Sequence, residues 1–197
     1  MADLPQTRAS LLVRLRDHQD ADAWRQFVEV YAPLVYRLYR GKGLQDADAA
    51  DLMQQVLCAV STAARRLEYD PKRGLFRSWL FTLAHRKLCD FFRHRGRHEQ
   101  GSGDSGMQAL LEDQPAPEEE QQWNQEYQRR VFAWAAEQVR GRFSPNTWQA
   151  FWLTAVDKCD TAEVARELGI TVAAVYLAKS RVMARIKEEI KSLDMKE

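Results

Sequence analysis

The sequence predicts an all-α protein built from two small helical domains that a flexible acidic linker joins. Apolar residues recur at three- and four-residue steps along several segments, which is the spacing of one helix face. No segment alternates apolar and polar residues over a useful length, so we expect no sheet. Between residues 96 and 120 the composition shifts to Gly, Ser, Pro and acidic residues, which is typical of a linker.

The bulk composition suits a cytoplasmic globular protein. Of 197 residues, 45% are hydrophobic, which is enough for packed cores. No run approaches the roughly 18 apolar residues of a membrane span, and residues 1–10 lack the apolar stretch of a signal peptide. Cys58, Cys89 and Cys159 are odd in number and far apart, as expected of reduced thiols. We therefore expect no membrane insertion, no metal and no cofactor.

The net charge of +1 hides a strong segregation of charge along the chain. Residues 1–95 carry 16 Lys and Arg against 11 Asp and Glu, and residues 121–197 carry 12 against 10. Residues 96–120 carry one Arg against seven acids. Two weakly basic segments therefore flank an acidic connector, and local potential rather than total charge governs binding to a polyanion.

Three helices are expected before the linker. The first ends at Gly41 and Gly43, the second opens at Asp46 or Asp48, and the third runs from near Phe76 to about Arg95. A turn at residues 70–74 separates the second from the third. Their predicted buried residues are, in order, Trp24, Phe27, Val28, Tyr31, Val35 and Leu38; Leu52, Val56, Val60, Ala63 and Leu67; and Trp79, Leu80, Leu83, Leu88 and Phe91.

After the linker the helical spacing resumes. One helix is expected from Gln121 to about Arg140, and Ser144 with Pro145 is a typical start of the next. Two short helices follow, one from Thr161 and one from Thr171.

Residues 161–177 have the pattern of a helix-turn-helix. Ala165 is small where two helices would cross, Gly169 suits a turn that needs a positive φ, and Val175 would pack back into the hinge. An ordinary helical hairpin has the same pattern, but the basic stretch 179–187 favours DNA binding. The residues expected to meet duplex DNA are Thr171, Ala173, Tyr176, Leu177, Lys179, Ser180, Arg181 and Arg185.

The third helix and the turn before it combine cations with aromatic residues. Residues 65–97 hold ten Lys and Arg against three acids, with six aromatic residues interleaved. Cations follow a phosphate backbone and aromatic faces stack on unpaired bases, although Trp79 and Phe91 fall on the predicted buried face. The residues expected to contact an opened strand are Tyr69, Arg73, Arg77, Ser78, Thr82, Arg86 and Arg93.

Together these motifs resemble a known family. Residues 48–57 (DAADLMQQVL) resemble the helix by which bacterial sigma factors bind the polymerase clamp. Residues 76–93 (FRSWLFTLAHRKLCDFFR) resemble the helix with which extracytoplasmic-function sigma factors read and melt the minus-ten element. The helix-turn-helix resembles their fourth region, which reads the minus-thirty-five element, and the order, spacing and acidic linker also match.

The resemblance implies a function. Residues 1–95 would be sigma region 2, which binds core polymerase and reads and melts the minus-ten element. Residues 96–120 would be the flexible acidic linker, and residues 121–197 sigma region 4. The chain would be an alternative sigma factor that directs promoter-specific initiation and is not an enzyme. Its polymerase contacts would be Asp48, Asp51, Leu52, Gln54 and Gln55.

The resemblance also names partners. Core RNA polymerase and promoter DNA are the expected partners, with an anti-sigma factor as a further candidate. The free protein is expected to be a monomer. The chain departs from the family at Gln55, where an acid is frequent, at Leu57, where Phe is frequent, and at Tyr176, where Lys is common.

Two other functions were weighed against this one. A helix-turn-helix regulator that binds duplex DNA without polymerase leaves the helices at 48–57 and 76–93 unexplained. An enzyme with a metal cluster at Cys89, His94 and His98 would lack any acid pair, nucleophile triad or phosphate loop. A purely structural role for Asp48 and Asp51 is to complement the helix dipole.

Overall fold

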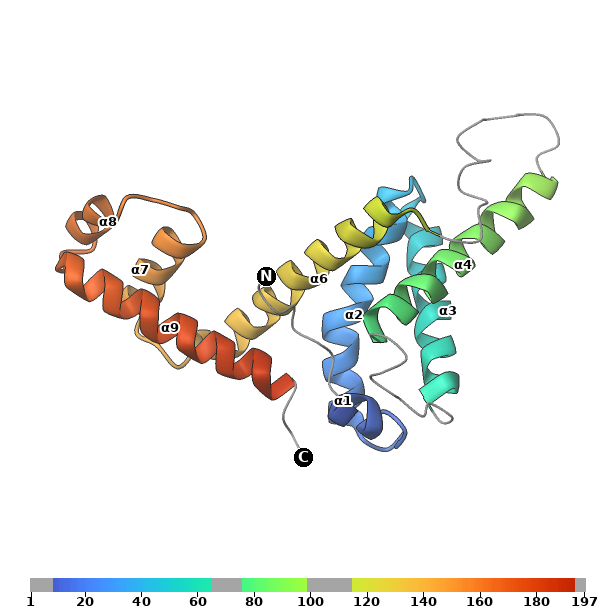
Figure 1. The fold of residues 1–197 in the computed structure, drawn as a ribbon, viewed down its shortest axis with the longest axis horizontal. Coiled ribbons are helices and arrows are strands. Elements are labelled where there is room, and N and C mark those ends of the chain that lie inside the picture. The colour runs from blue at the N-terminus through green and yellow to red at the C-terminus, as the bar shows by residue number, and fades with distance from the viewer. Residues whose placement is uncertain (1–8, 65–75, 99–114, 194–197) are drawn as a thin grey trace. The chain divides into compact units, whose positions relative to one another are not determined.

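A computed structural model describes residues 9–64, 76–98 and 115–193 (Figure 1). Every regular element in these residues is an α-helix, which confirms the predicted fold class. Contacts divide the chain into two compact units, and the boundary along the chain falls between Arg130 and Val131. The helices are α1 Ala9–Arg14, α2 Ala21–Gly41, α3 Asp46–Ala64, α4 Phe76–His98, α6 Pro117–Arg140, α7 Pro145–Ala155, α8 Thr161–Glu167 and α9 Val172–Leu193.

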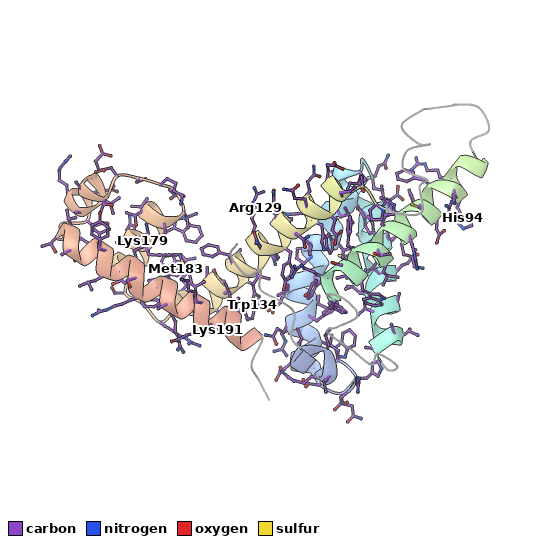
Figure 2. All side chains as sticks on the ribbon, viewed as in Figure 1. His94, Arg129, Trp134, Lys179, Met183 and Lys191 are labelled. Carbon is purple, nitrogen blue, oxygen red and sulfur yellow. The ribbon has the colours of Figure 1, made fainter. Side chains whose placement is uncertain are left out.

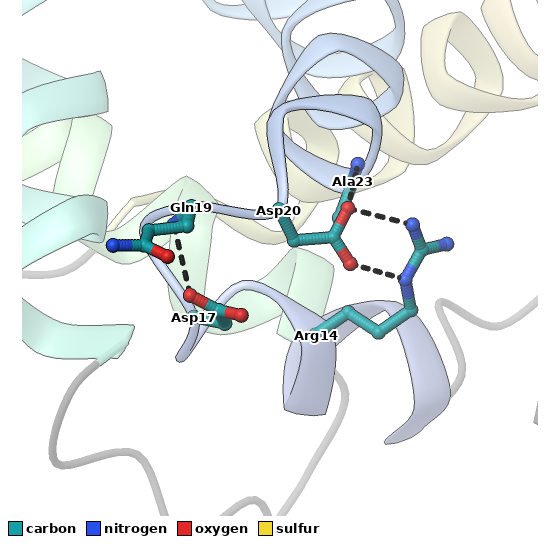
Figure 3. A network of polar contacts seen from close by, with 5 residues as sticks. All are labelled: Arg14, Asp17, Gln19, Asp20 and Ala23. Carbon is teal, nitrogen blue, oxygen red and sulfur yellow. Dashed lines mark hydrogen bonds and ion pairs between the residues drawn. The ribbon is translucent and has the colours of Figure 1, made fainter.

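Helix α1 was not predicted, and it is joined to α2 by a polar network (Figure 3). Arg14 donates to both carboxylate oxygens of Asp20, at 2.7 and 2.8 Å, and Asp20 accepts from the backbone N–H of Ala23 at 2.9 Å. Asp20 is therefore the N-cap of α2. The hydrogen bond from Arg14, and after it the one from Ala23, hold the pKa of Asp20 below its ordinary value.

The core of the first unit lies where α2 meets α3 and α4. Phe27 and Tyr31 of α2 are fully buried and meet the edge of Phe76 of α4, with ring centroids 6.0 and 5.6 Å apart. Tyr39 is also buried, and its hydroxyl donates to the backbone carbonyl of Ala84 at 3.0 Å. That burial raises the pKa of Tyr39. Each such aromatic side chain contributes about 1.5–3 kcal/mol through burial.

The predicted buried faces needed some corrections. Val28 is 40% exposed and Trp79 is 37% exposed, so both predictions of burial were wrong. The side chains that α4 buries form two adjacent rows with a spacing of four, and Trp79 lies off both: Phe76, Leu80, Ala84 and Leu88 in one, and Arg77, Phe81, His85 and Cys89 in the other. Leu67, which was also predicted to be buried, lies outside the described residues.

The first half of α6 packs on the first unit rather than on the second. Trp123 and Tyr127 are 3% and 4% exposed. The Trp123 ring packs on Phe81 at 5.3 Å and its Nε1 donates to the backbone carbonyl of Arg77, while Tyr127 stacks on Tyr31 at 5.7 Å. The helix thus starts at Pro117, inside the range predicted as linker, and the unit boundary falls at Arg130 rather than at residue 120.

A proline in α2 explains the last contact of this half-helix. Pro33 has no N–H, so the carbonyl of Glu29, one turn earlier, lacks its usual helical donor. Arg130 supplies the missing hydrogen bonds, with Nε and Nη2 at 3.2 and 2.8 Å from that carbonyl oxygen. The carbonyl that lacks its helical donor in α2 therefore becomes a hydrogen-bonding site for α6.

The second unit contains two small apolar clusters. Phe151, Val182 and Ile186 lie at the centre of one, where α7 and α9 meet the end of α6. Val164 and Val175 lie in the other, between α8 and α9. The predicted start of α7 is confirmed, with Ser144 accepting from the N–H of Thr147 and Pro145 in the first turn. The predicted starts at Thr161 and next to Thr171 are confirmed as well, but only α8 is short: α9 has 22 residues, so the prediction of a short second helix was wrong.

Candidate polymerase and promoter interfaces

Helix α3 presents a polar face on the side opposite its buried stripe. Asp51, Gln54 and Gln55, which were predicted to contact polymerase, are exposed. The buried stripe holds this face outward by packing against α2 and α4, and it consists of Ala49, Leu52, Val56, Val60 and Ala64. The arrangement leaves carboxylate and amide groups available to a basic partner surface.

Two predicted polymerase contacts have other surroundings. Leu52 is 3% exposed, so the prediction that it contacts a partner is corrected: its side chain holds α3 in the core. Asp48 is half-buried, and its Oδ2 lies 3.4 Å from Nη1 of Arg95 on α4. This contact between α3 and α4 is partly exposed, so its contribution to stability is small.

Helix α4 exposes two of its predicted DNA contacts. Arg86 is exposed and makes no hydrogen bond or ion pair with other described residues, while Arg93 is exposed beside Asp90 at 3.6 Å. The Thr82 hydroxyl donates to the backbone carbonyl of Ser78 at 3.0 Å. Tyr69 and Arg73 lie outside the described residues.

Arg77 and Ser78, which were also predicted to contact DNA, face the first half of α6. Arg77 is 4% exposed, its Nε donates to Asn124 at 2.8 Å, and its guanidinium lies 5.8 Å from the centre of the Tyr127 ring. The Ser78 hydroxyl donates to Glu120 at 2.9 Å. A buried cation with these partners has a packing role in the first unit, which corrects the prediction that Arg77 lies on the DNA surface.

Negative charge on α6 faces positive charge on the same unit. Glu119 forms an ion pair with Lys42, and its second oxygen lies 3.8 Å from Nδ1 of the buried His85. Glu126 accepts from Arg37 at 2.5 Å. Part of the acidity that the sequence assigned to the linker therefore neutralises cations of the first unit.

Helices α8 and α9 have the geometry of a helix-turn-helix. Gly169 has φ of +64°, as the predicted turn requires, and Ile170 donates from its backbone to the carbonyl of Ala165 at 3.0 Å. Ala165 and Val175 are 5% and 1% exposed, which confirms their predicted packing. Thr171 caps α9 by accepting from the N–H of Ala174 at 3.1 Å. Asp160, which was not predicted, caps α8.

The outer face of α9 exposes the remaining predicted DNA contacts. Tyr176 and Leu177 are 60% and 56% exposed, and Ala173, Ser180 and both neighbouring cations are exposed too. Lys179 (Figure 2) and Arg181 make no hydrogen bond or ion pair with other described residues. Arg185 pairs with Glu188 at 2.6 Å.

Comparison with known proteins shows what the chain is similar to. The profile of sigma-70 region 2 matches residues 27–98. RNA polymerase sigma factor CnrH of Cupriavidus metallidurans is 25% identical over 170 residues, which cover 83% of this chain and 84% of that protein. ECF RNA polymerase sigma factor RpoE of Cereibacter sphaeroides is 29% identical over 84 residues, 43% of this chain and 45% of that protein. These likenesses support an extracytoplasmic-function sigma factor.

The residues that match sigma-70 region 2 contain α3 and α4 completely, together with most of α2. The two faces described above, the polar side of α3 and the exposed cations of α4, therefore both belong to region 2. The first half of α6 lies after the matched residues, yet it completes the same packed unit.

Trp79 is a candidate contact that sequence analysis missed. Its indole ring is 37% exposed and is held at 5.3 Å from Phe76, next to Ser78 and on the same helix as Arg86. The spacing of four between buried residues of α4 was the signal that could have placed it outside the core. An exposed aromatic ring on a helix that also carries exposed cations suits stacking on an unpaired base.

Two further observations concern metal binding and membrane spans. Among the described residues, no group of three or more His, Cys, Asp or Glu side chains could hold a metal ion. Of the metal cluster considered in the sequence analysis, Cys89 is buried, and His98 has a side chain that lies outside the description. Within the same residues, no helix is long and apolar enough to cross a membrane.

Proposed function

We propose that this sigma factor directs core RNA polymerase to its own set of promoters and catalyses no reaction itself. The observation that carries the proposal is the joint presence of three different faces in one chain. Region 2 exposes a polar α3 and a cationic, aromatic α4, and the second unit exposes a basic recognition helix. Each face suits a different partner, as the following paragraphs argue.

Core polymerase binding is assigned to α3. The exposed carboxylate and amides of Asp51, Gln54 and Gln55 suit a basic partner surface. The pairing of Asp48 with Arg95 makes Asp51 the cleaner test, since its reversal disturbs no described contact. Asp51→Lys should abolish co-purification with core polymerase and leave helicity unchanged. As a matched control, Asp22→Lys reverses an exposed acid near the start of α2 and should co-purify normally.

Recognition of the opened minus-ten strand is assigned to the exposed side of α4. Arg86 and Arg93 supply positive charge, Trp79 supplies a stacking surface, and Tyr69 and Arg73 stay part of the proposal. Base stacking on an aromatic ring contributes about 1–3 kcal/mol.

Binding of duplex DNA is assigned to α9. The N-terminal residues of a recognition helix meet base edges in the major groove, and cations further along meet phosphates. In this chain those cations are Lys179, Arg181 and Arg185. Replacing Lys179 and Arg181 with Ala should weaken recruitment to promoters and reduce its dependence on salt.

The two DNA roles can be separated with a pre-melted template. Variants at Arg86 and Trp79 should bind promoters but fail to open them, as read by permanganate reactivity of unpaired thymines. A template with an artificial bubble should partly rescue these variants and should not rescue the Lys179 and Arg181 variants. Equal rescue of both classes, or of neither, would contradict the assignment.

The same materials test the alternative of a duplex-binding regulator, because such a protein would shift promoter DNA without polymerase.

We also propose that the free protein is monomeric, which light scattering tests, and that it works in the cytoplasm. An anti-sigma factor as a further partner stays a prediction from the family resemblance.

A further inference from the structure

The first two turns of α9 expose a cluster of apolar side chains. In the described part of the chain, six large apolar side chains are exposed, and three of them are Val172, Tyr176 and Leu177. They are 43%, 60% and 56% exposed, and Ala173 beside them is exposed as well. Such a concentration on one short helical surface, outside any core, indicates a binding surface.

None of these side chains lies on the face of α9 that packs into the core of the second unit. Val175, Ala178 and Val182 point into the second unit and are at most 6% exposed. Val172 and Tyr176 are four residues apart, as are Ala173 and Leu177, so the four side chains form two adjacent rows on the outer face. The packing of the helix-turn-helix therefore holds the apolar cluster outward.

Hydrogen-bonding side chains are scarce on the same surface. Residues 171–178 contain no Arg, Lys, Asn or Gln, which are the residues that recognise guanine or adenine through paired hydrogen bonds. The Thr171 hydroxyl oxygen already accepts from the N–H of Ala174, and the other hydroxyl in these residues is that of Tyr176. Base recognition by paired hydrogen bonds is therefore not available to these turns.

Charge next to the cluster identifies its occupant. Lys179, which is labelled in Figure 2, and Arg181 follow within the next turn. Neither makes a hydrogen bond or ion pair with other described residues. An apolar protein partner would gain little from these cations, whereas the major groove of duplex DNA has phosphates at its edges and thymine C5-methyl groups on its floor. Apolar side chains contact that methyl group in the major groove.

We propose that Val172, Ala173, Tyr176 and Leu177 recognise thymine methyl groups in the minus-thirty-five element, so that this sigma factor selects the element by apolar contact. The proposal rests on the proposed function, since it assigns the chemistry of the duplex that α9 binds. From residue 172 to residue 177 the helix rises about 7.5 Å. The cluster therefore spans roughly two steps of the 3.4 Å between base pairs.

Replacement of thymine by deoxyuridine tests the proposal directly, because it removes the methyl group and leaves base pairing intact. Duplexes that polymerase holoenzyme containing this protein binds are first selected from a random library. Each thymine of the selected minus-thirty-five element is then replaced singly by deoxyuridine, and the Kd of the holoenzyme is measured. We expect a loss of about three- to fourfold for each contacted methyl group. Uracil in place of thymine outside the element should change nothing.

Protein variants locate the contact. Leu177→Ala should weaken binding to thymine duplexes and remove the sensitivity to deoxyuridine at one position. Tyr176→Phe should keep that sensitivity, since the ring stays and the hydroxyl is not needed. Arg181→Ala is the control on the same helix: it should weaken binding to thymine and deoxyuridine duplexes by the same factor.

The outcomes separate this inference from the proposed function. Promoter-specific binding that is indifferent to every deoxyuridine replacement would overturn the methyl contact and leave the sigma-factor assignment standing. Sensitivity that persists unchanged in both Leu177→Ala and Tyr176→Ala would overturn it too. If the protein recruits core polymerase to no duplex at all, the proposed function itself fails.

Discussion

Replacing Trp123 with Ala should destabilise the first unit, although the sequence alone would place this residue in the second domain. The indole is 3% exposed, packs on Phe81 at 5.3 Å and donates to the carbonyl of Arg77 at 3.2 Å. All of these partners lie on α4, in the first unit. The stability of each unit in this variant therefore shows which unit the first half of α6 stabilises.

The size of the effect follows from the burial. Truncation of a buried Trp to Ala costs about 3–5 kcal/mol in free energy of unfolding, because apolar area and close contacts are both lost. Each 1.4 kcal/mol is a factor of ten in an equilibrium constant, so amides that exchange only on unfolding of the unit should exchange about 100- to 4,000-fold faster.

Hydrogen exchange by mass spectrometry on the full chain measures this unit by unit. Peptides from residues 76–90 should lose protection in Trp123→Ala, while peptides from residues 145–190 should not. Phe151→Ala is the matched control, since Phe151 is fully buried in the second unit and should give the opposite pattern. Loss of protection in residues 145–190 of the Trp123 variant, with residues 76–90 unchanged, would refute the assignment of this half-helix.

Three further predictions follow from single contacts. Arg130→Ala should destabilise the protein by about 0.5–1.5 kcal/mol in chemical denaturation, since the contact is exposed. The loss should be smaller in a Pro33→Ala background, because an N–H at position 33 would donate to the Glu29 carbonyl that Arg130 now serves; equal losses in both backgrounds would contradict this. Gly169→Ala should cost about 1–2 kcal/mol and weaken duplex binding, since an L side chain is strained at φ of +64°; an unchanged melting temperature would count against the turn geometry. The pKa of Asp20 is lowered in the fold, so its contribution to stability is present at neutral pH and declines as the pH falls below the ordinary value of 3.8 and through the lowered value. NMR titration of the carboxyl should show this, and Arg14→Met should reduce the shift and leave the part due to the Ala23 N–H; an unchanged pKa in that variant would contradict the assignment.

Much of the local structure could be predicted because short-range rules govern it. The turn at Gly169, the cap at Ser144 and the small Ala165 each follow from backbone geometry or helix packing over a few residues. The helices α2, α3, α4, α7, α8 and α9 were predicted for the same reason. Helix α1 was missed because six residues give too short a period to recognise.

Long-range contacts were the part that the sequence could not supply. Nothing local reveals that Arg130 meets the carbonyl freed by Pro33, or that Arg77 is buried under Asn124. The acidic residues after Pro117 looked like linker because their composition matches one, yet Glu119 and Glu120 face cations and a hydroxyl of the first unit. Composition describes a segment by itself, whereas burial depends on what it packs against.

The two-domain prediction with an acidic linker stays open to test by limited proteolysis. Its composition predicts that the first cut falls between residues 96 and 120, and the contacts of α6 favour a site before Pro117. A linker as resistant as the flanking helices would contradict the prediction.

Run-off transcription with core RNA polymerase tests the central claim most directly. Core polymerase alone and core polymerase with this protein are compared on a library of promoters, with Asp51→Lys as the matched variant. The account predicts discrete transcripts from a subset of promoters, which require the protein and disappear with the variant. Transcripts that do not depend on the protein, or a protein that binds promoter DNA yet yields no transcript with core polymerase, would contradict it.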